Sequence, residues 1–73
     1  MEQEGVFLGE IMKSEIDKIV ISLKEYKGHK YVDVRTFFQG EDGNWIPTKK
    51  GVTISPKFID TLINILVKGK VTK

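Results

Sequence analysis

The sequence of 73 residues contains no cysteine, so no disulfide bond can stabilise its fold. It has one histidine, His29, with no second soft ligand nearby, which argues against a structural zinc site. A chain this short makes one domain at most, and a lone core of that size is marginal. We therefore expect good packing or a second chain to supply the missing stability, and we expect no cofactor or metal.

Long apolar runs are also missing. No stretch reaches the ~18 apolar residues that a membrane-spanning helix needs. The first residues, Met-Glu-Gln-Glu, are acidic, whereas a signal peptide begins with a basic region followed by an apolar run. We expect a cytoplasmic protein without a membrane partner, associated with the nucleoid if its source is bacterial.

The motifs of common enzyme classes do not occur either. There is no glycine-rich phosphate loop of Walker type, no nucleophile elbow and no metal-ligand spacing. His29 lies beside an expected turn without an acidic partner in the sequence. Asp33 and Arg35 share one face of an expected strand and are interpreted as an ion pair. The sequence therefore predicts a protein that is not an enzyme.

Charge is present, but it is distributed unevenly along the chain. The net charge is +2, yet residues 1–17 carry a net charge of −4 and residues 18–73 carry +6. A dimer would double the basic surface. Such segregation favours a polyanionic partner such as nucleic acid, although a merely well-solvated surface has the same composition.

Alternation of apolar and polar residues predicts a sheet across the middle of the chain. We expect residues 1–8 to be flexible, residues 9–69 to form the folded domain and residues 70–73 to be a basic tail. Turns are expected at Lys27-Gly28 and at residues 41–44, where glycine and asparagine tolerate positive φ. A basic loop is expected at residues 47–51. The four expected strands are residues 18–24, 30–38, 45–46 and 52–54.

A helix is expected after the last strand. Ser55 suits its N-cap, Pro56 its first turn and Gly69 its end. Its apolar residues cover more than the ~100° stripe that a single contact needs. The excess favours a homodimer formed through the helix, unless the helix lies deep against its own sheet. The expected interface residues are Phe58, Ile59, Leu62, Ile63 and Leu66.

The sheet face away from the helix combines basic and aromatic side chains. The covered face suits Ile19, Ile21, Leu23, Val32 and Val34, which leaves the opposite face to Lys18, Ser22, Lys24, Tyr26, Tyr31, Asp33 and Arg35. Exposed rings stack on the bases of a single strand, and basic side chains follow its phosphates, whereas a duplex hides its base faces. The alternative is that rings such as Tyr31 and Phe37 pair across strands and stiffen the sheet.

Three segments together resemble the DNA-binding domain of the positive cofactor four (PC4) transcriptional coactivators. They are the aromatic-Lys-Gly turn at residues 26–28, the Val-Asp-Val-Arg strand at residues 32–35 and the Pro-x-Lys-Lys-Gly loop at residues 47–51. The similarity runs from about Ile19 to Leu66. It implies an α+β fold with a four-stranded, curved antiparallel sheet followed by one C-terminal helix (β-β-β-β-α). It also implies a helix-mediated homodimer with channels for single-stranded DNA.

The same resemblance implies roles for particular residues. Tyr26 falls on a base-stacking aromatic, Lys27 on a phosphate-contacting lysine, Arg35 on a channel arginine and Phe38 on a stacking tryptophan. The basic loop, residues 49–51, falls on a segment that closes over the DNA backbone. The predicted DNA-binding residues are Tyr26, Lys27, His29, Lys30, Arg35, Phe38, Trp45, Lys49, Lys50 and Gly51.

The sequence also departs from the family pattern at three positions. His29 replaces a frequent basic residue, although Lys30 is adjacent, and Ile46 falls where a human-type member has a lysine. Phe38 has the opposite strand parity from Arg35, so the two share a face only if a bulge intervenes. Without a bulge, Phe37 is the stacking ring.

Together these features predict a homodimeric, largely sequence-independent single-stranded-DNA-binding protein of transcription, or of replication and repair. It would protect melted strands or hold them open. RNA binding through the same face stays an alternative, because stacking and phosphate contacts do not distinguish the two sugars. A second alternative is a coactivator module whose basic face docks an acidic protein of the transcription machinery.

Overall fold

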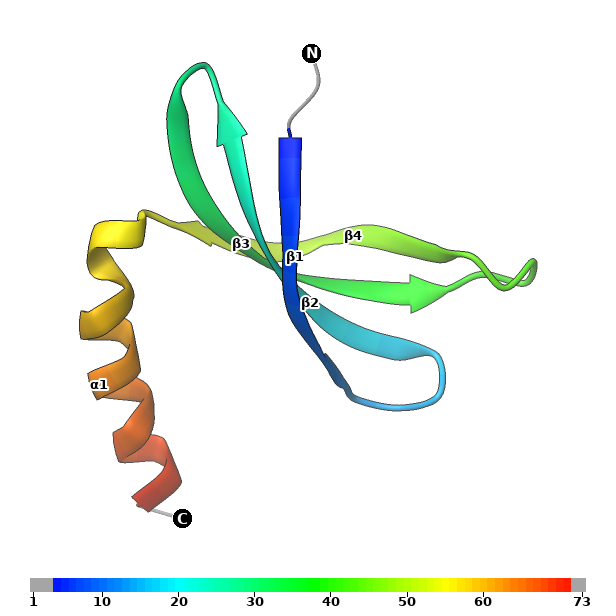
Figure 1. Cartoon of the computed structure of the whole chain (residues 1–73). Helices are drawn as coiled ribbons and strands as arrows, with labels where there is room; N and C mark the ends of the chain where they lie inside the picture. Colours follow the sequence, from blue (N-terminus) through cyan, green and yellow to red (C-terminus); the bar gives the residue numbers. More distant parts are fainter. Residues whose placement is uncertain (1–3, 72–73) are drawn as a thin grey trace.

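The computed structural model describes residues 4–71, which form four strands, a short 3-10 turn and one helix. The strands β1 (Glu4–Met12), β2 (Asp17–Tyr26), β3 (His29–Gln39) and β4 (Trp45–Ile54) make one antiparallel sheet in that order. The turn η1 (Pro56–Phe58) leads into the helix α1 (Ile59–Val71). Figure 1 shows a strongly twisted open sheet followed by α1, which confirms the predicted β-β-β-β-α fold.

The strand β1 corrects the prediction of a flexible start, because residues 4–8 belong to it and residues 4–7 pair with β2. Residues 1–3 lie outside the described residues. The register shifts between Phe7 and Gly9, so Leu8 is an extra residue that breaks the alternation by which strands are recognised. Because β1 is part of the sheet, β2 is paired with a neighbouring strand on both of its edges.

The strand β4 corrects a second prediction, because residues 45–46 and 52–54 belong to one continuous strand. The segment predicted as a loop, residues 47–51, stays paired with β3 through Pro47 opposite Phe37 and Gly51 opposite Arg35. Proline is tolerated there because β4 is an edge strand and need not donate to a second neighbour. The four strands are therefore not the four that local patterns indicate.

The turns between strands follow from residues that accept positive φ. Lys27 (φ 54°) and Gly28 (φ 80°) link β2 to β3 in a two-residue turn of the kind that matches the right-handed strand twist. In the β3–β4 turn Gly43 has a φ of 89°, and the Asn44 N–H donates to Asp42 Oδ1 over 3.0 Å. That hydrogen bond lowers the pKa of the Asp42 carboxyl from its usual value.

The helix α1 departs from its predicted ends. Ser55 is extended, but its side chain makes no capping hydrogen bond, and the first turn is 3-10 rather than α. Gly69 lies within α1 instead of ending it, and Lys70, predicted to belong to a basic tail, is also helical. Residues 72–73 of that tail lie outside the described residues. A single glycine inside a helix costs only about 1 kcal/mol, which apolar and lysine neighbours can offset.

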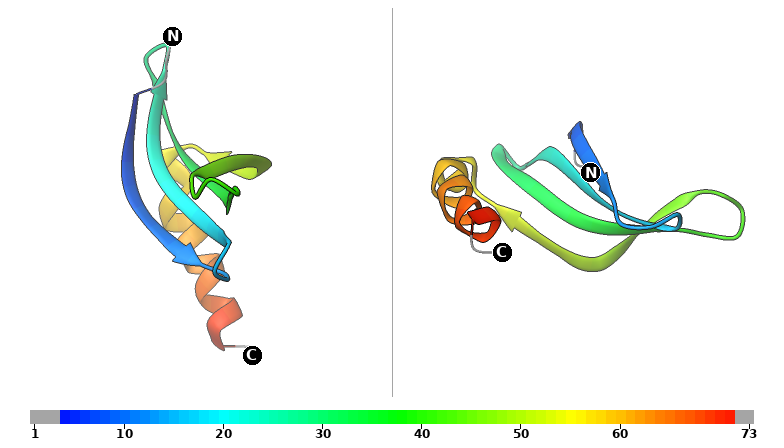
Figure 2. Two further views of the ribbon diagram at one scale, coloured as in Figure 1. Left: turned by 90° about the vertical axis from the view of Figure 1, so that its right-hand side faces the viewer. Right: turned by 90° about the horizontal axis from the view of Figure 1, so that it is seen from below.

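The chain by itself has almost no core. Among residues 5–70, the buried side chains are those of Val32 and Asp33. The radius of gyration is 13.9 Å, whereas a compact domain of this length has about 11 Å. Figure 2 shows why, because α1 stands beside the curved sheet and does not lie across it. Within one chain, the helix therefore does not cover the sheet as expected.

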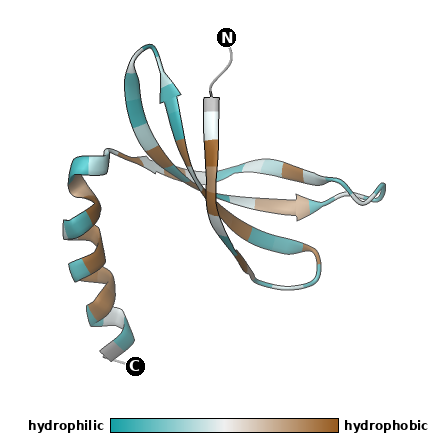
Figure 3. Cartoon of the chain, viewed as in Figure 1, coloured by the Kyte–Doolittle hydropathy of each residue, from teal (hydrophilic) through white to brown (hydrophobic). Residues whose placement is uncertain are grey.

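An open groove of about 600 Å³ separates α1 from the apolar face of the sheet. Every residue that lines it is apolar, and Figure 3 shows hydrophobic segments along α1 and near the point where the strands cross. Four of the five residues expected on the covered face contribute to it. The lining residues are Leu8, Ile11, Ile19, Ile21, Val32, Val34, Ile54, Ile59, Leu62 and Leu66.

Candidate nucleic-acid interface

The other face of the sheet carries basic and aromatic side chains in cross-strand rows. Lys24 pairs with Tyr31, Ser22 with Asp33, and Lys18 with Phe37. Because side chains alternate along each strand, these residues share one face, as the sequence predicted for all of them except Phe37. We call it the basic-aromatic face and define it by Lys18, Ser22, Lys24, Tyr26, His29, Tyr31, Asp33, Arg35, Phe37 and Trp45.

The tip of the β2–β3 hairpin holds three of the predicted DNA-binding residues. Tyr26 is 48% exposed, Lys27 Nζ lies 5.3 Å from the centroid of its ring, and His29 is paired opposite it. Lys30 is paired with Glu25 and belongs to the other face, so it does not stand in for a basic residue at His29. The tip therefore presents one accessible ring next to one lysine.

The register decides between the two phenylalanines of β3. Pairing between β2 and β3 is unbroken from Tyr26 opposite His29 to Asp17 opposite Phe38. With no bulge in this ladder, Phe37 lies on the face of Arg35, and Phe38 lies on the opposite face, paired with Ile46 across β4. Phe38 therefore does not share the face of Arg35, and Phe37, the alternative expected in the absence of a bulge, does; a contact of Phe37 with DNA stays a prediction.

Trp45 belongs to a cluster that the sequence analysis missed. Lys18 Nζ lies 4.3 Å from the centroid of the Trp45 ring and 2.9 Å from Glu10 Oε1. The ammonium group thus covers part of the ring and is itself neutralised by a carboxylate. Only the pairing of β1 with β2 brings Glu10 to Lys18, and that strand was not predicted.

Phe7 is a second residue that the sequence analysis missed. It pairs with Ser22, so it lies on the basic-aromatic face, and it is 61% exposed. A ring that exposed gains little from packing and is free to contact a ligand. The sequence pattern does not reveal Phe7, because the bulge at Leu8 interrupts the alternation of the strand to which Phe7 belongs.

The strand β4 bulges at the predicted basic segment. Between the pair of Arg35 with Gly51 and the pair of Phe37 with Pro47, residues 48–50 stand opposite Thr36 alone. Lys49 and Lys50 are exposed within this bulge. The basic segment is therefore a bulge inside a strand and is tied to β3 on both sides.

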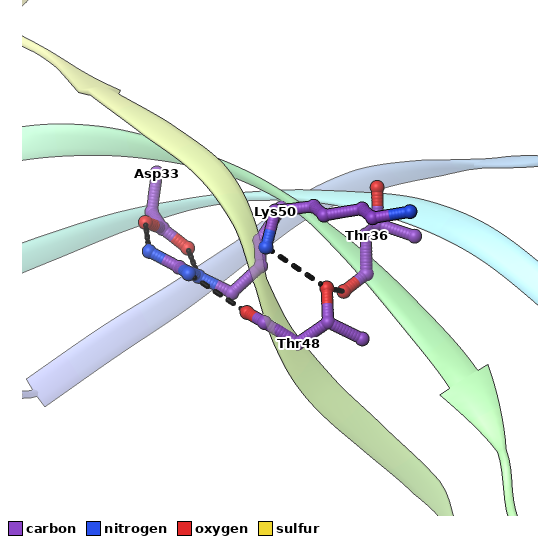
Figure 4. Close-up of polar contacts among 5 residues, drawn as sticks. Asp33, Thr36, Thr48 and Lys50 are labelled. Atoms are coloured by element: carbon purple, nitrogen blue, oxygen red, sulfur yellow. Dashed lines mark hydrogen bonds and ion pairs between the residues drawn. The ribbon is translucent and has the colours of Figure 1, made fainter.

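A polar network from β3 holds the bulge (Figure 4). Arg35 Nε and Nη2 donate to the two carboxylate oxygens of Asp33 over 3.2 and 3.0 Å, and Nη1 donates to the Thr48 carbonyl over 2.9 Å. The Thr48 hydroxyl donates to the Thr36 carbonyl over 2.8 Å and accepts from the Lys50 N–H over 3.1 Å. Donation to Asp33 raises the pKa of the Arg35 guanidinium above its usual value. The predicted ion pair is confirmed.

Gly51 leaves room for that network. A Cβ atom at this position would stand 2.9 Å from Arg35 Cζ and 3.0 Å from the Val34 carbonyl oxygen. Real Cβ atoms do not approach backbone or a fixed guanidinium so closely, so a side chain would displace Arg35 or part the strands. Gly51 is therefore needed for the packing of Arg35 and the pairing of β3 with β4, independently of any contact with a ligand.

The predicted dimer residues divide between two surfaces. Ile59, Leu62 and Leu66 line the apolar groove. Phe58, in η1, is 53% exposed and Ile63 is 50% exposed, and neither lines the groove. Their part in an interface stays a prediction.

Two kinds of site are missing from the part of the chain that the structure describes. No three acidic or histidine side chains in residues 4–71 come together as metal ligands would. No helix in the same range has both the length and the apolar character needed to cross a membrane.

Comparison with known proteins gave one family and three solved structures. The family described as Transcriptional Coactivator p15 (PC4) matches residues 13–65. Two crystal forms of a PC4 homolog from Burkholderia pseudomallei, orthorhombic and tetragonal, are 32% and 33% identical to the chain, with TM-scores of 0.89 and 0.85. The matches cover 94% of this chain and 93% of that chain for the first form, and 92% and 98% for the second.

A more distant structure shares the fold. It is the bacteriophage T5 homolog of the eukaryotic transcription coactivator PC4, implicated in recombination-dependent DNA replication. It is 17% identical with a TM-score of 0.58, over 97% of this chain and 77% of that chain. No curated protein gave a match.

Proposed function

The chain belongs to the PC4 family of transcriptional coactivators, and from that premise we propose that it binds single-stranded DNA as a homodimer. The proposed setting is transcription, or replication and repair, in the cytoplasm or at the nucleoid. The proposal includes no catalytic step. The observation that carries it is the basic-aromatic face, where exposed rings and lysines lie on one side of an open sheet.

The chemistry of this face suits a single strand better than a duplex. Tyr26 and Phe7 are exposed rings, and each base of a single strand offers a π-face worth about 1–3 kcal/mol in stacking. Lys24 and Lys27 supply positive charge for the phosphates between the bases. A duplex would bring its phosphates but not its base faces, so the rings would contribute little.

The apolar groove supports the homodimer. With Val32 and Asp33 as the buried side chains of residues 5–70, one chain leaves its hydrophobic face in water. Leu66 and Ile63 are at least half exposed on α1. A second copy is the partner always available at the concentration of the protein itself, and its own α1 carries the same apolar residues. The groove would then become the core that the single chain lacks.

Fluorescence anisotropy tests the proposal with matched single-stranded DNA, duplex DNA and RNA of about 20 nucleotides, each at two salt concentrations. Single-stranded DNA should bind tightest, with an affinity that falls as salt rises. Lys24→Ala should weaken binding and reduce the salt slope by about 0.7 if it loses one phosphate. Lys57→Ala, which removes the same charge in η1, is the matched control.

Each other result has a definite meaning. Equal or tighter binding of RNA would make RNA the ligand of this face. Preference for duplex would contradict the stacking argument. If the protein binds none of the three nucleic acids and instead captures an acidic protein, and if that capture survives nuclease treatment, the result would favour the protein-interaction module.

A further inference from the structure

We propose that Arg35 is a positioning residue and not a phosphate contact. With Asp33 and Thr48 it forms a clamp that holds Lys49 and Lys50 in the β4 bulge at the edge of the basic-aromatic face. The consequence for DNA binding rests on the proposed function, whereas the clamp itself is a feature of the fold and is testable without DNA.

The hydrogen bonds of Arg35 leave it poorly suited to a phosphate. Three of its five N–H groups donate within the chain, Nε and Nη2 to Asp33 and Nη1 to Thr48, so Arg35 keeps only one N–H on each Nη atom for another partner. Its side chain is 26% exposed, and that of Asp33 is 5% exposed. If Arg35 turned away to a phosphate, it would leave a buried carboxylate without a partner, which is strongly unfavourable. Because Asp33 neutralises Arg35, the pair also adds little net attraction for a polyanion.

The contacts of the clamp converge on the bulge from separate positions. Arg35 holds the Thr48 carbonyl, the Thr48 hydroxyl bridges the Thr36 carbonyl and the Lys50 N–H, and Gly51 leaves the space that the guanidinium occupies. The pairs Arg35–Gly51 and Phe37–Pro47 fix the two ends of the bulge, where three residues of β4 stand opposite one of β3. The hydrogen bonds of the clamp hold the backbone between those ends, from which the two lysines extend.

A fixed bulge has a direct benefit for binding. Ordering a long side chain on association costs about 0.5–1.5 kcal/mol, and a backbone already held in place lowers what remains to be ordered. Lys49 and Lys50 are exposed, and the preceding Thr48 is bonded to β3 through its carbonyl and its hydroxyl, which also accepts from the Lys50 N–H. Two exposed charges thus follow a residue that is held at two points.

Two conservative changes separate positioning from contact. Asp33→Asn removes a negative charge from the basic-aromatic face, so a phosphate-binding Arg35 would bind oligo-dT as well as before or better. The clamp predicts the opposite, roughly 5- to 100-fold weaker binding, because the lysines lose their fixed base. Arg35→Lys keeps the charge but loses the two-pronged geometry, so it should weaken binding similarly, whereas a simple cation contact would tolerate it.

A double-mutant cycle identifies the residues through which Arg35 acts. When Lys49 and Lys50 are both alanine, Arg35→Lys should cause no further loss of affinity. A further loss as large as that in the wild-type background would overturn the proposal, because a phosphate contact acts independently of the lysines. The melting temperature of each variant shows whether the fold persists, and Thr48→Val with its matched control Thr48→Ser tests the clamp if the Asp33 variant does not fold.

Hydrogen exchange at the Lys50 amide tests the clamp without DNA. Its N–H donates to the Thr48 hydroxyl, so exchange should accelerate in Thr48→Val and in Asp33→Asn but stay near wild type in Thr48→Ser. Unchanged exchange in both altered variants would refute the clamp. If wild-type protein fails to bind oligo-dT, the proposed function fails, and the exchange data still decide whether the clamp exists.

Discussion

Leu66 of α1 is 61% exposed in a single chain, although it lines the apolar groove beside the sheet. Full burial of a leucine contributes about 1.5–3 kcal/mol, so covering the exposed part contributes roughly 1–2 kcal/mol in each chain. A symmetric dimer contains the residue twice, and Leu66→Ala should therefore cost about 2–4 kcal/mol of association free energy. At 1.4 kcal/mol for each factor of ten, the dimer dissociation constant should rise by roughly 30- to 700-fold.

Sedimentation velocity over a range of concentrations measures that shift. The wild-type protein should sediment as a dimer of twice 8.3 kDa at micromolar concentration, and the variant should dissociate at concentrations where wild type does not. Ile16→Ala is the matched control, because Ile16 is 58% exposed in the β1–β2 turn and does not line the groove. Leu62→Asp should be more severe, since a charge in the closed groove could not be solvated. A wild-type monomer that is folded and unfolds cooperatively at micromolar concentration would refute the reasoning.

Three further predictions concern the hairpin ends. Tyr26→Ala should change the free energy of unfolding by no more than about 0.5 kcal/mol, yet weaken oligo-dT binding by about 1–3 kcal/mol. Tyr26→Phe should bind normally, because stacking uses the ring. A fall in melting temperature with unchanged binding would mean that the ring packs against the protein instead of stacking on a base. Lys27→Asn should raise the melting temperature, because asparagine accepts the φ of 54° better than lysine does. Oligo-dT binding should weaken through the lost charge. A lower melting temperature would contradict the turn assignment. The Asp42 pKa lies below its usual value, so this carboxylate stabilises the β3–β4 turn above its unfolded pKa, and that contribution is lost as pH falls through the lower folded pKa. The NMR shift of the Asn44 amide should follow that titration, and Asp42→Asn should abolish it.

The centre of the sheet was predictable because its pattern is local and regular. Ile19 and Ile21 alternate with polar neighbours, and the Lys27-Gly28 turn sets the register with Val32 and Val34. The unbroken ladder keeps that parity, so the division of β2 and β3 into an apolar and a basic-aromatic face is confirmed. The Asp33–Arg35 pair follows for the same reason, since residues two apart on a strand lie side by side.

The edges of the sheet were not predictable in this way, because each contains a bulge. Leu8 interrupts the alternation of β1, so the local pattern does not reveal the first half of that strand, residues 4–8, which were expected to be flexible. Residues 48–50 of β4 have a local sequence typical of a loop, yet Thr48 donates to the Thr36 carbonyl and accepts from Arg35 on β3. Contacts over twelve and thirteen positions leave no periodic signal in either segment.

What the sequence determined by itself is therefore the two faces of the central hairpin and the apolar stripe of the helix, which follow from backbone periods and turn chemistry acting over a few residues. The family and its β-β-β-β-α order followed from the resemblance of three short segments. The tertiary structure decided that Phe37 and not Phe38 shares the face of Arg35, that Glu10 neutralises Lys18 at Trp45, and that three of the five N–H groups of Arg35 donate within the chain. These depend on how distant segments pair: the β2–β3 ladder is unbroken, whereas β1 and β4 pair across bulges that a local pattern does not reveal.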